Sequence, residues 1–319
     1  MNDFRLFTLS DAQKIQYNSQ PDVLVDFNWI HEDDHEIIPY MPGTAMRFWY
    51  NNLTTHYSTH WHNSVEIIVP LENTFQVIIQ NQGYCLNPGD ILIIPAGHLH
   101  ETISPDTGSR FVFCFELDFL SHLQGYSYIA SLLSEPILIN DTLCPEIYTG
   151  AISQIMQLAG HYWGNSISKE VRIYAGLMEF FSNYADYYTY QKTGLDHTST
   201  TDSRNLNAKL TVAFDYLEYH FQEDIALEDV ADAAGFSKFH FCRIFKECTG
   251  KTFREYLALR RIKAAESLLT NPNLHITDIA MQCGFNSLSV FNRTFKQCKR
   301  CTPSEFRQFH TEPLSSAPM

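Results

Sequence analysis

Three histidines and a glutamate stand at a spacing that could hold a metal ion or a polar ligand. His60, His62 and Glu66 form the pattern H-x-H-x3-E in HWHNSVE, and His100 follows in GDILIIPAGHLH. Alternate residues of a β-strand share one face, so His60 and His62 are expected to point the same way. Three imidazoles and one carboxylate suit a divalent transition metal, which is the candidate cofactor. The alternative is that they serve only as hydrogen-bonding or packing groups.

The same region predicts a pocket for a small molecule. Arg47 and Trp49 lie in the strand-like run TAMRFWYN, which precedes the histidines. An aromatic face with a few charged hydrogen-bonding groups suits a polyol or a sugar, although each residue could also be an ordinary side chain of the strands. The candidate effector-binding residues are Arg47, Trp49, His60, His62, Glu66 and His100.

A second set of chemistry-bearing residues lies in a sequence repeat. LEDVADAAGF and SKFHFCRIFKECTGKTFREYL (Leu227–Leu257) return about 49 residues later as ITDIAMQCGF and NSLSVFNRTFKQCKRCTPSEFR (Ile276–Arg307). Each copy predicts a short helix, a glycine turn and a second helix, which is the pattern of a helix-turn-helix. Two such units indicate a protein that binds two successive major grooves of double-stranded DNA.

The second helix of each unit is expected to have a buried face and an exposed face. Phe241, Ile244 and Phe245 in the first copy, and Phe291 and Phe295 in the second, are spaced as core residues. On the opposite face, arginine and asparagine can contact base edges and lysine suits phosphates. The predicted DNA-binding residues are Lys238, Phe239, Cys242, Arg243, Lys246, Leu288, Ser289, Asn292, Arg293 and Lys296.

The two copies differ in what they can contact. Asn292 and Arg293 give the second unit the better chemistry for base recognition. In the first unit, Phe239 and Cys242 beside Arg243 favour anchoring to DNA through apolar contacts and contacts with phosphates. The alternative for both is a helical bundle whose exposed stripe is merely solvated.

The elements that must position these residues change character along the chain. Short runs rich in β-branched and aromatic residues between Thr44 and Leu117 predict a small β-sandwich or barrel. Residues 144–163 and 169–190 carry apolar residues at helical spacing. The polar stretch Gln191–Asn205 predicts a linker. The first 43 residues are expected to form an arm with a strand at Asp22–Trp29.

Charge is distributed unevenly over the 319 residues, whose net charge is −14. Residues 205–319 hold 14 Lys and Arg against 13 Asp and Glu, whereas residues 1–204 hold 8 against 23. The asymmetry indicates two different roles on one chain. No apolar run approaches the ~20 residues of a membrane span and no signal-peptide pattern is present, so a cytoplasmic protein without a membrane partner is expected.

Residues 207–309 resemble the DNA-binding domain of AraC/XylS-type transcription regulators. The resemblance rests on DVADAAGFSKFHFCRIFKECTG, the helical rod LRRIKAAESLL, DIAMQCGF, FNRTFKQ and TPSEFR. It implies that base-contacting positions are held by Phe239, Cys242, Arg243, Leu288, Ser289, Asn292 and Arg293. Arg300 departs from the family pattern, which usually has glycine there.

The histidine region is similar to both motifs of the cupin barrel, a common sensor domain in this family. Gly89, Pro95, Gly97 and His100 give the second motif, G-x5-P-x-G-x2-H. Two positions depart from the motifs: Asn73 stands where the first ends in Gly, and Ser104 where the second ends in Asn.

The expected fold class is multidomain α+β: a cupin-like β-barrel, a helical segment and an all-α domain with two helix-turn-helix units. The expected domains are a ligand-sensing barrel with its arm (1–135), a helical coupling or dimerisation segment (136–192), a linker (193–205) and the DNA-binding domain (206–311). In a homodimer, the helical segment would contact its partner through Ile152, Ile155, Met156, Ile173, Leu177, Phe180 and Phe181, unless these only cover the barrel.

The expected function is sequence-specific transcription regulation controlled by a small-molecule effector, a sugar or related metabolite, and not enzymatic turnover. The expected partners are promoter DNA, the effector and a second copy of the chain, with RNA polymerase as a further candidate. Two alternatives are a metal-binding cupin protein or enzyme fused to a DNA-binding domain, and a ligand-independent DNA-binding protein.

Overall fold

We describe the protein from a computed structural model, which defines residues 8–18, 34–41, 44–52, 56–117, 120, 123, 125–193, 201–299 and 301–311. The chain divides into two compact units. Unit 1 comprises Met1–Leu120 and Leu133–Tyr187, and unit 2 comprises Ser121–Leu132 and Tyr188–Met319. The strand expected at Asp22–Trp29 and the departure at Arg300 lie outside the described residues.

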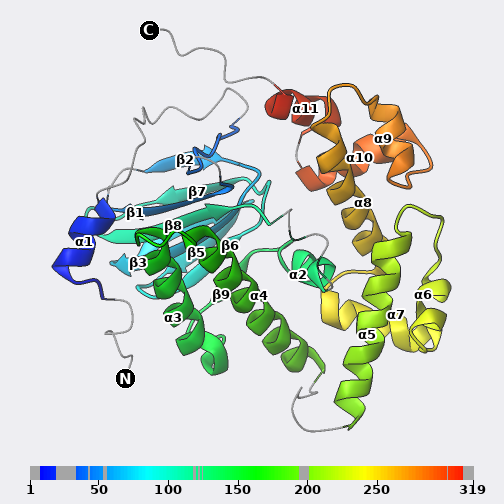
Figure 1. Ribbon diagram of the computed structural model, residues 1–319, viewed down its shortest axis with the longest axis horizontal. Helices are drawn as coiled ribbons and strands as arrows, with labels where there is room; N and C mark the ends of the chain where they lie inside the picture. The colour runs from blue at the N-terminus through cyan, green and yellow to red at the C-terminus, as the bar shows by residue number, and fades with distance from the viewer. Residues whose placement is uncertain are drawn as a thin grey trace. The chain divides into compact units, whose positions relative to one another are not determined.

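Unit 1 contains two antiparallel sheets (Figure 1). One has the strand order β1-β8-β3-β6-β9 and the other has the order β2-β7-β4-β5. The strands are β1 (Met46–Asn51), β2 (Tyr57–His60), β3 (Val65–Glu72), β4 (Phe75–Ile79), β5 (Gln82–Leu86), β6 (Ile91–Ile94), β7 (His100–Ile103), β8 (Ser109–Phe115) and β9 (Ile137–Ile139). This arrangement confirms the cupin-like β-domain. The sequence did not predict β2 as a separate strand, nor β7 or β9.

The two faces of the five-stranded sheet pack against different layers. Aligned residues Phe48, Phe113, Ile67, Ile93 and Ile137 form one buried row across all five strands. Helices α3 (Pro145–Tyr162) and α4 (Lys169–Thr193) lie across this face, as Figure 1 shows. The opposite face meets the second sheet, and a smaller apolar cluster fills part of the interior with Ile68, Val77, Ile79, Leu86, Leu92 and Ile94.

The predicted dimer contacts on α3 and α4 are wrong in the described structure. Ile152, Ile155, Ile173, Leu177, Phe180 and Phe181 are each no more than 2% exposed, and Met156 is half-buried. These residues pack within unit 1, where the Phe181 ring lies 6.0 Å from that of Phe115 on β8. Their apolar stripes therefore cover the sheet.

A short N-terminal helix, α1 (Asp11–Asn18), lies beside the first sheet. Tyr17 stacks on Trp163 at 4.2 Å between ring centroids, and Lys14 pairs with Glu72 at 2.6 Å. No helix in the described ranges is long and apolar enough to cross a membrane.

Unit 2 is helical. Its helices are α2 (Tyr126–Leu132), α5 (Thr201–His220), α6 (Leu227–Ala233), α7 (Lys238–Thr249), α8 (Phe253–Leu269), α9 (Ile276–Gln282), α10 (Leu288–Lys299) and α11 (Pro303–Thr311). Helix α4 ends at Thr193 and α5 begins at Thr201, so helical structure occupies part of the expected linker. The other residues of that linker, 194–200, lie outside the part of the chain that the structure describes.

Both copies of the repeat fold as helix-turn-helix units, α6–α7 and α9–α10. Gly235 and Gly284 occupy the turns at φ 68° and 85°, a conformation that costs other residues energy. At Gly284 a side chain would also meet the backbone oxygen of Gln222 at 2.7 Å. The hydroxyls of Ser237 and Ser287 accept backbone hydrogen bonds at the starts of α7 and α10, so both recognition helices, α7 and α10, begin at a serine cap.

Candidate functional site

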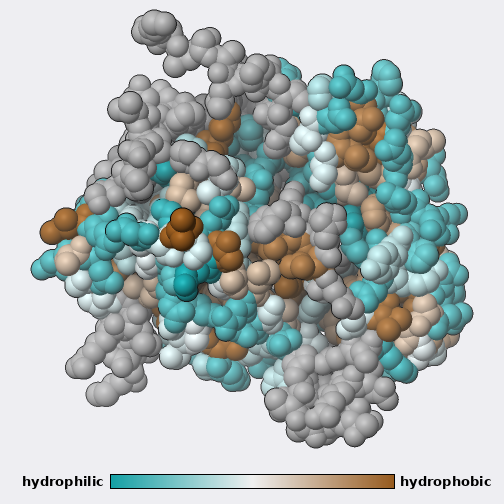
Figure 2. All heavy atoms as spheres, viewed as in Figure 1, coloured by the Kyte–Doolittle hydropathy of each residue, from teal (hydrophilic) through white to brown (hydrophobic). Residues whose placement is uncertain are grey.

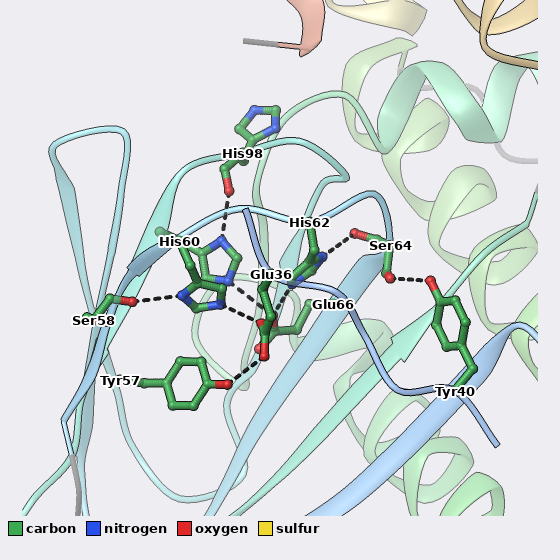
Figure 3. Close-up of polar contacts among 10 residues, drawn as sticks. Glu36, Tyr40, Tyr57, Ser58, His60, His62, Ser64, Glu66 and His98 are labelled. Atoms are coloured by element: carbon green, nitrogen blue, oxygen red, sulfur yellow. Dashed lines mark hydrogen bonds and ion pairs between the residues drawn. The ribbon is translucent and has the colours of Figure 1, made fainter. Parts of the chain in front are cut away.

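The four residues of the histidine motifs converge inside unit 1. His60 ends β2, His62 follows it, Glu66 lies on β3 and His100 begins β7. Each offers one ligand atom, and these atoms lie within 4.8 Å of one another. A Glu66 oxygen lies 2.8 Å from His62 Nε2 (Figure 3). The same oxygen lies 3.1 Å from His100 Nε2. All four side chains are at least nine-tenths buried.

The backbone fixes how the three imidazoles are oriented. Each Nδ1 atom lies within hydrogen-bond distance of a carbonyl oxygen two residues away. The carbonyls belong to Ser58, Ser64 and His98, at 2.8, 3.1 and 2.7 Å from His60, His62 and His100 respectively. Because a carbonyl only accepts, each Nδ1 is the donor, and each Nε2 is directed at the carboxylates. Orienting contacts of this kind are typical of metal-binding histidines.

Glu36 adds a second carboxylate that sequence reasoning missed. Its backbone N–H donates to the Trp61 carbonyl at 2.8 Å, which holds its segment beside the end of β2. One Glu36 oxygen lies 3.2 Å from His60 Nε2, and the other accepts from the Tyr57 hydroxyl (Figure 3). Glu36 belongs to no spacing motif, so only the three-dimensional pairing reveals it.

Both carboxylates are ionised despite their burial. Burial opposes ionisation of Glu66, but hydrogen bonds with His100 and His62 outweigh it, and its pKa lies well below its usual range. Burial likewise opposes ionisation of Glu36, but contacts with His60 and Tyr57 lower its pKa. The Nε2 atoms and the two carboxylates thus face one another within a buried cluster. Three imidazoles and a carboxylate gathered in this way are a ligand set that suits a divalent transition metal.

Arg47 and Trp49 lie on the same sheet face as Glu66 but two strands away. Arg47 is opposite Cys114 on β8, and Cys114 is opposite Glu66 on β3. The Arg47 guanidinium lies 5.6 Å from the centre of the Trp49 ring. Arg47 is buried and Trp49 is half-buried. Because both lie on β1, two strands from Glu66, they stand beside the histidine cluster and are not part of it.

The motif departures have structural explanations. Asn73 has φ 63°, a left-handed conformation in which glycine is favoured and asparagine is tolerated. Ser104 accepts a 2.7 Å hydrogen bond from Arg110, whose side chain lies over the Phe75 ring. Both residues therefore fit the barrel.

The predicted DNA-binding residues of unit 2 lie on the exposed faces of α7 and α10. The intervening core residues Phe241, Ile244, Phe245, Phe291 and Phe295 are buried, as the spacing predicts. The exposed residues are Lys238, Phe239, Cys242, Arg243 and Lys246 on α7, and Leu288, Ser289, Asn292, Arg293 and Lys296 on α10. Figure 2 shows mainly hydrophilic residues over the visible part of unit 2, with separate hydrophobic patches.

The two exposed faces differ in their ion pairs. On α7, Arg243 lies 3.0 Å from Glu247, and Lys238 pairs with Glu228 of α6. On α10, no ion pair joins Arg293 to another residue within the described ranges. Phe239 is 86% exposed, which gives the first unit a large apolar contact. The geometry thus supports different contacts for the two units.

Two protein-family models match the chain. An AraC-like ligand binding domain matches residues 47–136, and a helix-turn-helix domain matches residues 230–308. The first therefore covers the strands from β1 to β8, without Met46 of β1 and without β9, and the second covers both recognition helices.

Known proteins with similar sequences are described as regulators. YdeC of Bacillus subtilis (strain 168), an uncharacterized HTH-type transcriptional regulator, is 24% identical over 272 residues, covering 82% of this chain and 89% of that protein. A Staphylococcus aureus protein with the same description is 39% identical over 99 residues, covering 31% of this chain and 13% of the relative. Among solved structures, ToxT from Vibrio cholerae is 18% identical, with a TM-score of 0.43, covering 84% of this chain and all of that one.

Proposed function

The chain belongs to the AraC-type DNA-binding transcription regulators, and from that premise we propose that a small polar effector bound in unit 1 controls how unit 2 binds promoter DNA. Its matched domains are those of a regulator and not of an enzyme. We assign the effector site to Arg47, Trp49, His60, His62, Glu66 and His100. Binding would favour one of two arrangements of the protein and so change its affinity for DNA.

One observation carries this proposal: the four motif residues converge, buried, in the domain that matches a ligand-binding family. Buried polar groups inside an apolar shell are what orient a small ligand. Trp49 adds an aromatic face near Arg47, which is the kind of surface that a sugar or polyol uses.

A thermal-shift screen of the full chain with sugars and polyols tests the effector site. A ligand at about 100 times its Kd adds ~2.7 kcal/mol, enough to raise the melting temperature by several degrees. His62→Ala should abolish the shift, whereas His220→Ala, which changes a histidine of unit 2 paired with Glu223, should keep it. A shift that survives His62→Ala would place the effector elsewhere.

A divalent transition metal ion is a second candidate effector. The convergence of one ligand atom from each of the four buried residues within 4.8 Å favours it, because such a set suits a transition metal ion. His60, His62, His100 and Glu66 would hold the ion, with Glu36 beside them. The ion would balance the negative charge of these carboxylates and hold together the strands that carry its ligands.

Metal analysis of the purified chain, followed by thermal shifts with Zn²⁺, Ni²⁺ or Mn²⁺ after EDTA dialysis, separates the two candidates. A metal effector should raise the melting temperature of the wild type and of His220→Ala but not of His62→Ala. If no ion binds and a sugar does, the metal candidate is wrong.

We further propose that the chain acts in the cytoplasm as a homodimer, because a symmetric pair doubles the DNA footprint. Since the predicted stripes are buried, the contact must use other residues; Ile167 and Val171, near the start of α4, are exposed apolar side chains. Light scattering should give twice the chain mass of 36.8 kDa, and a monomer both free and on DNA would contradict this. If the regulator activates transcription, RNA polymerase is its further partner.

A further inference from the structure

A short helix within the sensor sequence belongs structurally to the DNA-binding unit. Helix α2 follows β8 and precedes β9, and both strands lie in the same five-stranded sheet of unit 1. The AraC-like ligand-binding match also spans α2, since it extends to residue 136. Yet Ser121–Leu132 clusters with unit 2. The chain thus leaves one unit, contributes a helix to the other, and returns.

Tyr128 of α2 packs into the core of the first helix-turn-helix. Its ring centroid lies 5.1 Å from that of Phe214 on α5, and Phe214 lies 5.7 Å from Phe245 on α7. Phe245 is 1% exposed and belongs to the same buried cluster as Phe241. The aromatic contacts therefore run from α2 through α5 to the buried face of the recognition helix α7.

The hydroxyl of Tyr128 binds the C-terminal end of that helix. It lies 3.2 Å from the backbone carbonyl of Cys248 and 2.6 Å from the hydroxyl of Thr189, which is 6% exposed. The last four carbonyls of a helix have no partner within the helix, and Cys248 supplies one of them in α7. Tyr128 therefore donates to a buried backbone group that would otherwise depend on water or on a cap.

We propose that Tyr128 is a positioning residue for DNA binding: it holds the C-terminal end of α7 so that the exposed N-terminal half is presented correctly to DNA. A helix of 12 residues is about 18 Å long and rigid, so a displacement at Thr249 also tilts Phe239, Cys242 and Arg243. The proposal rests on the proposed DNA contacts of α7, and it is independent of the identity of the effector.

Tyr128→Phe tests the hydroxyl, because it keeps the ring against Phe214 and removes both hydrogen bonds. The readout is the affinity of the full chain for an oligonucleotide that the wild type selects from a random-sequence library, measured well below the melting temperatures of all variants. Losing a net hydrogen bond at the end of α7 should weaken binding about threefold to tenfold. Thr189→Val, which removes one of the two partners, should weaken binding less.

Tyr216→Phe is the matched control. Tyr216 lies on α5 and packs against the same core, with its ring centroid 4.4 Å from that of His220. No hydrogen bond of its hydroxyl occurs among the described residues. It should bind DNA as the wild type does. An equal loss for Tyr216→Phe and Tyr128→Phe would reduce the effect to general core packing and overturn the proposal.

Double variants identify the helix through which Tyr128 acts. If Tyr128 positions α7, the loss of DNA affinity caused by Tyr128→Phe should be smaller in an Arg243→Ala background. In an Arg293→Ala background the loss should be unchanged, because only coupled residues depart from additivity. Full additivity with Arg243→Ala, or unchanged binding by Tyr128→Phe, would overturn the proposal. If Arg243→Ala itself leaves binding unchanged, the DNA contact of α7 fails instead.

Discussion

At the scale of single residues, the two recognition helices differ in what their arginines contact. Arg243 is engaged by Glu247 on its own helix, whereas Arg293 stands beside Asn292 with no ion pair to another described residue. Forming a bidentate contact with guanine costs Arg243 its carboxylate partner, and Arg293 has no such cost. Base recognition should therefore depend more on α10 than on α7.

Arg293→Ala should weaken binding to the selected site about tenfold to a hundredfold and binding to random DNA much less. Arg243→Ala should give a smaller loss of specificity, because Arg243 must give up its ion pair with Glu247 to contact a base. Competition binding with selected and random duplexes measures both. Equal losses on the two DNAs would remove the base-contacting role from Arg293.

The buried carboxylate Glu66 should make the stability of the barrel pH-dependent. Its pKa in the folded protein lies well below the ordinary value of 4.5, so it contributes stability that is present above pH 4.5 and lost as pH falls through the folded-state pKa. The free energy of unfolding of Glu66→Gln should therefore fall furthest below that of the wild type at neutral pH, and the difference should shrink in acid. Urea unfolding at several pH values measures this difference.

Asp90 gives a control of opposite sign. Burial raises its pKa above the ordinary 3.8, so the ionised folded form is disfavoured and acid favours folding at this residue. The stability of wild type relative to Asp90→Asn should thus increase as pH falls. If the stability of the wild type relative to Glu66→Gln also increased as pH falls, the Glu66 carboxylate would not be ionised in the folded state.

At the scale of elements, the repeat also duplicates a capping box at the starts of α8 and α11. Thr252 N–H donates to Glu255 at 2.8 Å and receives the Glu255 N–H on its hydroxyl at 3.3 Å. Thr302 and Glu305 repeat this arrangement at 2.6 and 3.3 Å. Such reciprocal bonds satisfy amides that a helix start leaves unpaired.

Thr252→Ala and Thr302→Ala should each lower the free energy of unfolding by about 1 kcal/mol. Thr270→Ala is the control, because that exposed threonine follows α8 and donates only to the Ser267 carbonyl. Denaturant titration of the three variants measures the differences. A loss for Thr270→Ala as large as for the capping threonines would mean that the boxes contribute nothing specific.

Sequence prediction succeeded for elements whose burial pattern is long enough to show. Helices α3, α4, α7, α8 and α10 and the longer strands follow apolar periodicity, and the glycine turns mark the repeat. Strands β2 (YSTH) and β7 (HETI) are four residues long and mostly polar, so their pairing depends on the neighbouring strands rather than on their own pattern. Helix α2 has seven residues, too few for a period to be recognised.

The candidate site divides in the same way. His60, His62, Glu66 and His100 were predicted because motif spacing is a local property, although His62 follows β2 rather than lying on a strand with His60. Glu36 was missed because its contact with His60 depends on a segment that pairs with Trp61, which no local pattern encodes. The surplus of acidic residues lies before residue 205 in the sequence, and both helix-turn-helix units follow it.

At the scale of the whole molecule, net charge and DNA affinity are separate quantities. The chain carries −14 overall, yet counterion release depends only on cations that contact phosphates. The exposed faces of α7 and α10 offer Lys238, Arg243, Lys246, Arg293 and Lys296, of which two are ion-paired within the chain. Few phosphate contacts and a modest salt dependence follow.

The slope of log affinity against log salt should therefore be about −3 to −5 for each chain bound, at roughly −0.9 for every phosphate contact. Lys296→Ala should reduce its magnitude by ~0.9 and weaken selected and random DNA alike, because a phosphate carries no sequence. Lys169→Ala removes the same charge from unit 1, where the amine lies near Tyr162, and should leave the slope unchanged. Equal changes for the two lysines would mean that the net charge, rather than contact at α10, sets the salt dependence. Binding titrations between 50 and about 200 mM salt span the range in which such slopes are resolved.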